Sequence, residues 1–141
     1  MVTQSSDEKS NIIHPRRPLT RPQLEAILYL ADRMCQADGE VVAAERKVIN
    51  SLAEAANIRG FRQQKWYRDL TDETACDLLD LEVAKRGALV ALTLVLKADL
   101  NRNSDEHGFF HKVRDRLATG PVTVPVDLKA HEELALEYFR G

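Results

Sequence analysis

Apolar residues recur at steps of three and four along most of the chain, which is the spacing of a helix with one buried face. The first such run predicts a helix that is capped by Thr20, has Pro22 in its first turn and reaches about Ala37. A second run predicts a helix over 43–56. Further helices are predicted over 61–70, 72–81, 83–98 and 104–118, and from a cap at Asp127 onward.

The remaining segments do not fit a helix. Residues 1–19 are polar and include two prolines, so we expect a mobile tail that precedes a single domain over 20–141. Residues 120–125 include Pro121 and Pro125 with alternating valines, which predicts an extended strap on the surface. The predicted helix over 83–98 is apolar on nearly every face and should therefore lie at the centre.

Composition supports an all-α domain and excludes several classes of protein. Aromatic residues make up 6% of the 141 residues, which favours packed helices over a β-sandwich. With 20 basic against 22 acidic residues, the chain is too balanced for an obligate nucleic-acid binder. The longest apolar run, 87–96, is too short for membrane insertion, so we expect a cytoplasmic protein. Cys35 and Cys76 are interpreted as reduced, packed thiols.

An internal repeat is the strongest feature of the sequence. A shift of 61 residues places Asp38 on Asp99 and Glu45 on Glu106, and it also aligns the apolar positions of both flanking helices, with Ile49 on Phe110. We therefore predict about seven helices, arranged around two pseudo-symmetric helix-loop-helix units that bury each other's apolar faces.

The residues of the first repeat, Ala37-Asp38-Gly39-Glu40-Val41-Val42-Ala43-Ala44-Glu45-Arg46, resemble the signature of the tellurite-resistance protein TerB and TerB-like domains. The resemblance covers roughly residues 20–119, and Leu100 replaces Gly39 in the second copy. It implies a cytoplasmic, all-helical module linked to tellurite or other stress responses, with an acidic patch that is proposed to bind metal.

The carboxylates of Asp38, Glu45, Asp99 and Glu106 are the candidate metal ligands. A two-fold arrangement would bring both loops together, and converging carboxylates either bind a cation or raise one another's pKa values. Oxygen ligands alone would favour Ca²⁺ or Mg²⁺. The alternative is helix capping, in which a Glu at the third helical position bonds back to the cap residue. Val42 has no side-chain oxygen for such a cap, so capping explains Glu45 less completely.

Three other patterns are weaker. Asp99, Asn101, Asn103 and Asp105 have EF-hand spacing, but Ser104 and Phe110 replace the required Gly and Glu. A zinc site could use one helical stripe, but no fourth ligand is evident for His107, His111 and Asp115. A basic stripe with aromatic neighbours consists of Arg59, Arg62, Lys65, Arg68, Trp66 and Tyr67. It could contact phosphates. Acidic residues follow the stripe closely in the sequence, so a surface on which the opposite charges neutralise each other is favoured.

No nucleophile elbow, phosphate loop or HExxH motif is present. The expected function is therefore a non-enzymatic stress-response module that recruits a protein partner, with or without a divalent cation. Nucleic-acid binding is not expected, while peripheral membrane association through a partner and the oligomeric state are left open. The alternative is a metal-dependent hydrolase that uses the acidic cluster.

Overall fold

Helices make up most of the described chain. The computed structural model describes residues 12–16, 19–37, 42–98 and 104–140, and within these ranges it contains helices and no strands, as the sequence predicts. The elements are α2 (Arg21–Cys35), α3 (Ala43–Ala55), the 3₁₀ turn η1 (Phe61–Gln63), α4 (Lys65–Asp69), α5 (Asp72–Leu78), α6 (Glu82–Ala98), α7 (Ser104–Leu117) and α8 (Leu128–Phe139).

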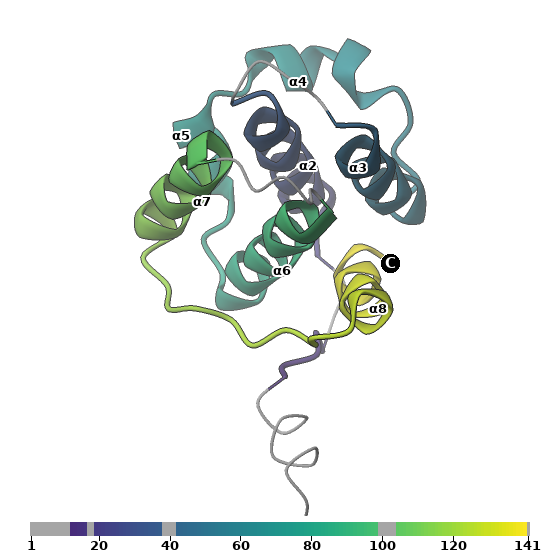
Figure 1. Cartoon of the computed structure of the whole chain (residues 1–141). Coiled ribbons are helices and arrows are strands. Elements are labelled where there is room, and N and C mark those ends of the chain that lie inside the picture. The colour runs from purple at the N-terminus through teal and green to yellow at the C-terminus, as the bar shows by residue number, and fades with distance from the viewer. Residues whose placement is uncertain (1–11, 17–18, 38–41, 99–103, 141) are drawn as a thin grey trace, which may run out of the picture.

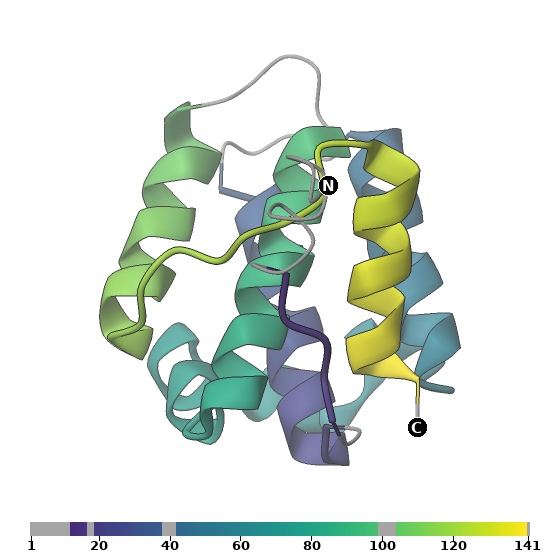
Figure 2. The same cartoon turned by 90° about the horizontal axis from the view of Figure 1, so that it is seen from below.

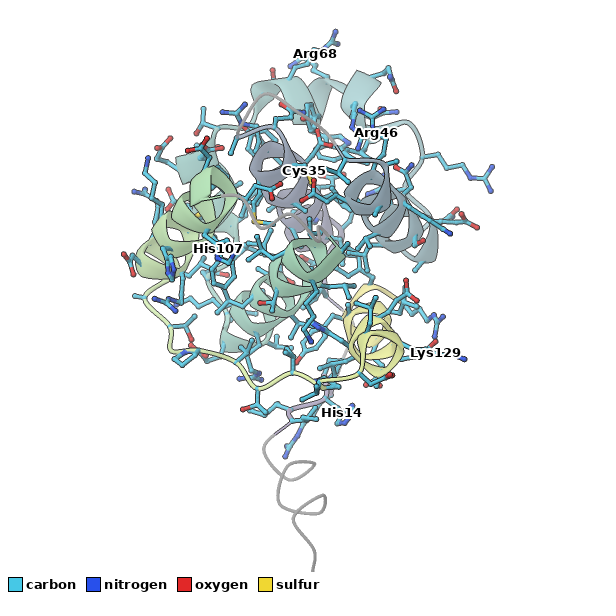
Figure 3. All side chains as sticks on the ribbon, in the orientation of Figure 1. His14, Cys35, Arg46, Arg68, His107 and Lys129 are labelled. Carbon is cyan, nitrogen blue, oxygen red and sulfur yellow. The ribbon has the colours of Figure 1, made fainter. Side chains whose placement is uncertain are left out.

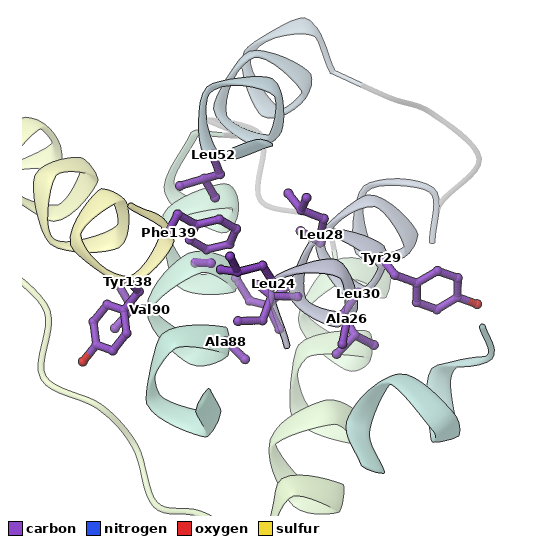
Figure 4. Packing of buried hydrophobic residues seen from close by; sticks show 14 of the residues in the cluster. Leu24, Ala26, Leu28, Tyr29, Leu30, Leu52, Ala88, Val90, Tyr138 and Phe139 are labelled. Atoms are coloured by element: carbon purple, nitrogen blue, oxygen red, sulfur yellow. The ribbon is translucent and has the colours of Figure 1, made fainter. Parts of the chain in front are cut away.

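Helices α2 and α6 form the centre of the molecule (Figure 1). They pack against each other, with α3 and α8 on one side and α5 and α7 on the other. Both central helices are buried over most of their circumference, which agrees with the nearly continuous apolar sequence of α6. Figure 4 shows how Leu24 and Leu28 of α2 meet Leu52 of α3 and Phe139 of α8 in the core.

The predicted helix starts at Thr20 and Asp127 are confirmed. The Thr20 hydroxyl accepts a hydrogen bond from the Gln23 amide, and the Gln23 side chain accepts one from the Thr20 amide at 2.9 Å. Asp127 accepts a bond from the Ala130 amide at 2.8 Å. These contacts satisfy helix-end amides that would otherwise lack a partner.

The predicted helix over 61–70 is interrupted at Gln64, whose backbone is extended between η1 and α4. Five positions along a continuous helix correspond to about 140° of rotation, so Arg62 and Tyr67 would point in different directions. In the structure, the side chains of both residues reach the carboxylate of Asp32. The break therefore allows the buried carboxylate of Asp32 to bind side chains from both η1 and α4.

Helices α6 and α8 approach each other closely at Gly87. A Cβ atom at this position would lie 2.9 Å from Cδ2 of Tyr138 and 3.1 Å from Cδ1 of Leu19. Leu19, the last residue of the expected tail, is itself buried against the core. In α8, Leu134, Ala135, Tyr138 and Phe139 are buried, whereas Leu128 is exposed.

Two extended segments cross the outside of the bundle. Figure 2 shows the strap after α7 running across α6 to α8, and the described N-terminal residues 12–16 running alongside α8. The Tyr138 hydroxyl donates a 2.7 Å hydrogen bond to the Ile13 carbonyl, and Lys97 donates one to the Pro125 carbonyl. Both segments are thus attached to the helices beneath them.

The helix pairs α2–α3 and α6–α7 correspond to the two repeats. Each packs on the other, because α3 contacts α6 and α7 contacts α2. Ile49 is fully buried, and its counterpart Phe110 is half-buried against the same core. The two-fold relation between the pairs stays a prediction.

Candidate metal centre

Three buried side chains bring metal-ligating atoms together between the helices. One ligand atom each from Cys35, Glu45 and Glu106 lies within 4.8 Å of the other two, and each of these side chains is at most 1% exposed. Figure 3 labels Cys35 beside α2, of which it is the last residue. Among the described residues, this is the only set of three His, Cys, Asp or Glu side chains so arranged.

The helix ends explain how these side chains meet. Cys35 is the last residue of α2, and Glu45 and Glu106 are each the third residue of the helix that follows a repeat loop, α3 and α7 respectively. Side chains in the first turn of a helix project near its amino-terminal end, so the repeat carries both glutamates to the same end of the bundle. The amino-terminal dipole of each helix also favours a carboxylate there.

The two glutamates of the cluster affect the Cys35 thiol. Burial, followed by the charges of Glu45 and Glu106, raises the pKa of the Cys35 thiol far above its usual range. A thiolate is therefore disfavoured there, whereas a bound cation would interact favourably with ionised carboxylates. The three groups can serve as one thiol and two carboxylate ligands, and a bound cation would make ionisation of the thiol easier.

The structure brings together two of the four predicted ligands. Glu45 and Glu106 belong to the cluster, whereas Asp38 and Asp99 lie outside the described residues. Cys35 was missed as a member because a single cysteine on the apolar face of a helix is typical of core packing. Its position just before the first repeat loop is the signal that could have identified it.

Capping does not involve a side chain at Val42. This residue is the N-cap of α3 and, as predicted, makes no side-chain capping bond. Glu45 is nevertheless fully buried. A carboxylate that only caps a helix end can stay in contact with water, so capping does not require this burial.

The structure does not support the two weaker metal patterns as clusters of described ligand atoms. His107, His111 and Asp115 on α7 belong to no group of three clustered ligand atoms in the described chain. In the EF-hand pattern, Asp105 is exposed at the start of α7, and the three earlier positions, 99, 101 and 103, lie outside the described residues.

Two of the four basic residues in the stripe, Arg62 and Lys65, have acidic partners, and these are Asp32 and Asp69 rather than the acidic residues that follow the stripe from α5 onward. Arg62 donates to Asp32 through Nε at 2.9 Å and Nη2 at 2.6 Å, and Lys65 pairs with Asp69 at 2.8 Å. The Tyr67 hydroxyl and the Gln36 amide also donate to Asp32, at 2.5 and 2.8 Å. Asp32 is 3% exposed and was not identified from sequence, although it anchors η1 and α4 to α2.

Within the described chain, no helix is both long and apolar enough to cross a bilayer. No protein-family model, curated protein or solved structure matches this chain. The resemblance to TerB-like domains therefore stays a prediction that rests on the residues of the repeat.

Proposed function

We propose that this helical domain is a non-enzymatic module that binds a divalent cation through Cys35, Glu45 and Glu106 and acts by recruiting a protein partner. The observation that carries the proposal is the meeting of three ligand atoms from three helices within 4.8 Å. Ligands of a tetrahedral site with bond lengths of about 2.0–2.3 Å lie roughly 3.3–3.8 Å apart, so a closing movement of at most about 1.5 Å would suffice.

The donor set changes the expected metal. The sequence suggested oxygen ligands and therefore Ca²⁺ or Mg²⁺, but a thiolate with two carboxylates suits Zn²⁺ better than either ion. Because the thiol must lose its proton to bind, the affinity for Zn²⁺ should increase with pH.

Burial supports binding rather than hydrolysis. A hydrolytic cation needs an open position that substrate or water can reach. Glu45 and Glu106 are at most 1% exposed, which suits a cation that fastens the helix ends together. We infer that the cation stabilises the end of the bundle formed by α2, α3 and α7, and that a partner binds this end.

Metal binding is tested with purified protein after treatment with a chelator and dialysis. Zn²⁺ should raise the melting temperature by several degrees, as a ligand that binds only the folded state must, and Ca²⁺ or Mg²⁺ should do so less. The double variant Glu45→Gln with Glu106→Gln should lose this gain, whereas Glu54→Gln, an exposed change on the same helix, should retain it.

Cys35→Ser tests the thiol separately and should reduce the preference for Zn²⁺ over Mg²⁺. If no ion shifts the melting temperature of the wild type and the double Gln variant is less stable, capping is the correct explanation. Metal-dependent turnover that the double Gln substitution abolishes would favour the hydrolase.

The stress response and the protein partner rest on the TerB-like resemblance. The stress response is tested in the source cell by replacing the gene with the double Gln variant, with Glu54→Gln or with a deletion. Tellurite sensitivity in the first and third strains but not in the second is expected. Equal tolerance in all strains would contradict the role in tellurite resistance.

A further inference from the structure

A second candidate site lies where the strap and the N-terminal segment pass over α6 and α8, and it shares no residue with the Cys35 cluster. A cavity of about 300 Å³, open to solvent on one side, is lined by segments that are far apart in sequence. The start of α6 contributes Arg86, α8 contributes Tyr138, the strap contributes residues 119–123, and the N-terminal segment contributes Ile13. Figure 2 shows these two extended segments passing over α6 and α8.

Arg86 gives this cavity a permanent positive charge, because a guanidinium does not lose its proton in proteins. Its Nε atom is buried and donates no hydrogen bond to any atom of the described chain. The nearest carboxylate oxygen, from Glu82, lies 3.9 Å from Nη1, which is beyond hydrogen-bond distance, and the Glu82 side chain is 61% exposed. Glu82 therefore compensates the positive charge of the Arg86 guanidinium only weakly.

The hydroxyl groups around Arg86 are polar neighbours of the same cavity. The Tyr138 hydroxyl lies beside the guanidinium and donates to the Ile13 carbonyl, and Figure 4 shows it pointing away from the packed core residues. The Thr119 hydroxyl donates to Glu82 at 3.2 Å, and Thr123 also lines the space. These groups can orient a ligand oxygen that binds Arg86.

Size and charge define the ligand. The volume corresponds to roughly ten water molecules, which suits a ligand of about ten non-hydrogen atoms. Arg86 is the one cationic residue of the described lining and Glu82 is also present, so a single negative charge fits better than the two of phosphate. Ile13, Pro121 and Val122 supply an apolar wall.

We propose that this cavity binds a small organic monocarboxylate, whose carboxylate pairs with Arg86 and whose apolar body lies against Ile13, Pro121 and Val122. A carboxylate can accept two parallel hydrogen bonds from a guanidinium, and the Arg86 side chain is 25% exposed. The bound ligand would connect the strap and the N-terminal segment to α6 and α8.

The probe is benzoate, and its neutral analogue benzamide provides the matched control. Binding is followed by NMR titration of the backbone amides of Thr119, Gly120, Val122 and Thr123. Benzoate should give saturable shifts at these amides, and benzamide should bind at least tenfold more weakly. Inorganic phosphate should also bind more weakly than benzoate.

Three variants test the role of the guanidinium. Arg86→Gln should weaken benzoate binding at least tenfold, whereas Lys85→Gln, which removes the same charge from the next residue, should change it less than twofold. Arg86→Lys keeps the charge without the planar fork and should be intermediate, and it serves as the test if Arg86→Gln does not fold. Equal binding of benzoate and benzamide, unchanged binding by Arg86→Gln, tighter binding of phosphate, or shifts confined to other residues would overturn the proposal.

Discussion

An oxygen atom of Glu45 and one of Glu106 lie within 4.8 Å of each other in the interior, although the two residues are 61 positions apart. The same spacing separates the two repeats, so equivalent positions of both copies converge on one place. Cys35 is the third member of this group, and the charges of both glutamates help to raise its pKa. The ionisation of this thiol therefore reports on the two glutamates beside it.

Both thiols of the metal-free protein should react slowly with iodoacetamide. Burial raises the pKa of Cys76 to about 11, so at pH 8 roughly 0.1% of it is thiolate, the form that reacts. Cys35 should react more slowly still, because it is less exposed and the nearby carboxylates raise its pKa further. Mass spectrometry of the labelled peptides gives both rates, and unfolded protein is the control. Faster labelling of Cys35 than of Cys76 would contradict this description of the cluster.

Asp32 should contribute strongly to stability through its bonds to Arg62, Tyr67 and Gln36. Asp32→Asn leaves the Arg62 guanidinium without its carboxylate partner and should lower the free energy of unfolding by about 2–3 kcal/mol, as measured by urea denaturation. Asp69→Asn removes an exposed ion pair with Lys65 and should leave the denaturation midpoint nearly unchanged. Similar denaturation midpoints for the two variants would show that Asp32 does not anchor η1 and α4 to α2.

Periodicity predicted the helices well because it is a local property. The bounds of α2, α3 and α7 differ from prediction by at most two residues at each end. The break at Gln64 could not be predicted in this way, because it depends on Asp32, which lies more than 30 positions away and looks like an ordinary surface acid in sequence. The participation of Cys35 in the cluster likewise requires the packing of α2 against α3 and α7.

His131 should make the stability depend on pH in mildly acidic solution. Its Nε2 atom lies 3.0 Å from the Val90 carbonyl oxygen, and burial lowers its pKa to about 4, with a smaller contribution from the positive charge of Lys97 in the same direction. The unfolded state therefore binds more protons between about pH 6.5 and pH 4. Stability should be fully present above pH 6.5 and should decrease, by at most about 3 kcal/mol, as the pH falls to 4.

The His131 contribution is isolated by comparing urea denaturation of the wild type and His131→Gln at several pH values. Glutamine keeps a hydrogen-bond donor for the Val90 carbonyl but does not titrate. The variant should have a flatter profile between pH 5 and pH 6.5, where most carboxylates remain ionised. Parallel profiles for both proteins would assign the pH dependence to other groups.

Two glycines within helices should respond to alanine in opposite directions. At Gly108 of α7, a Cβ atom would have no neighbour within 4 Å, so Gly108→Ala should stabilise the protein by about 0.5–1 kcal/mol through helix propensity. At Gly87 the same methyl group would lie 2.9 Å from the Tyr138 ring and 3.1 Å from Leu19. Crowding of this kind costs about 1–3 kcal/mol, which exceeds the gain in helix propensity. Gly87→Ala should therefore lower the denaturation midpoint while Gly108→Ala raises it. Stabilisation by both changes would mean that α8 can move away from α6 at little cost, and that the contact between Gly87 and Tyr138 does not set the distance between these helices.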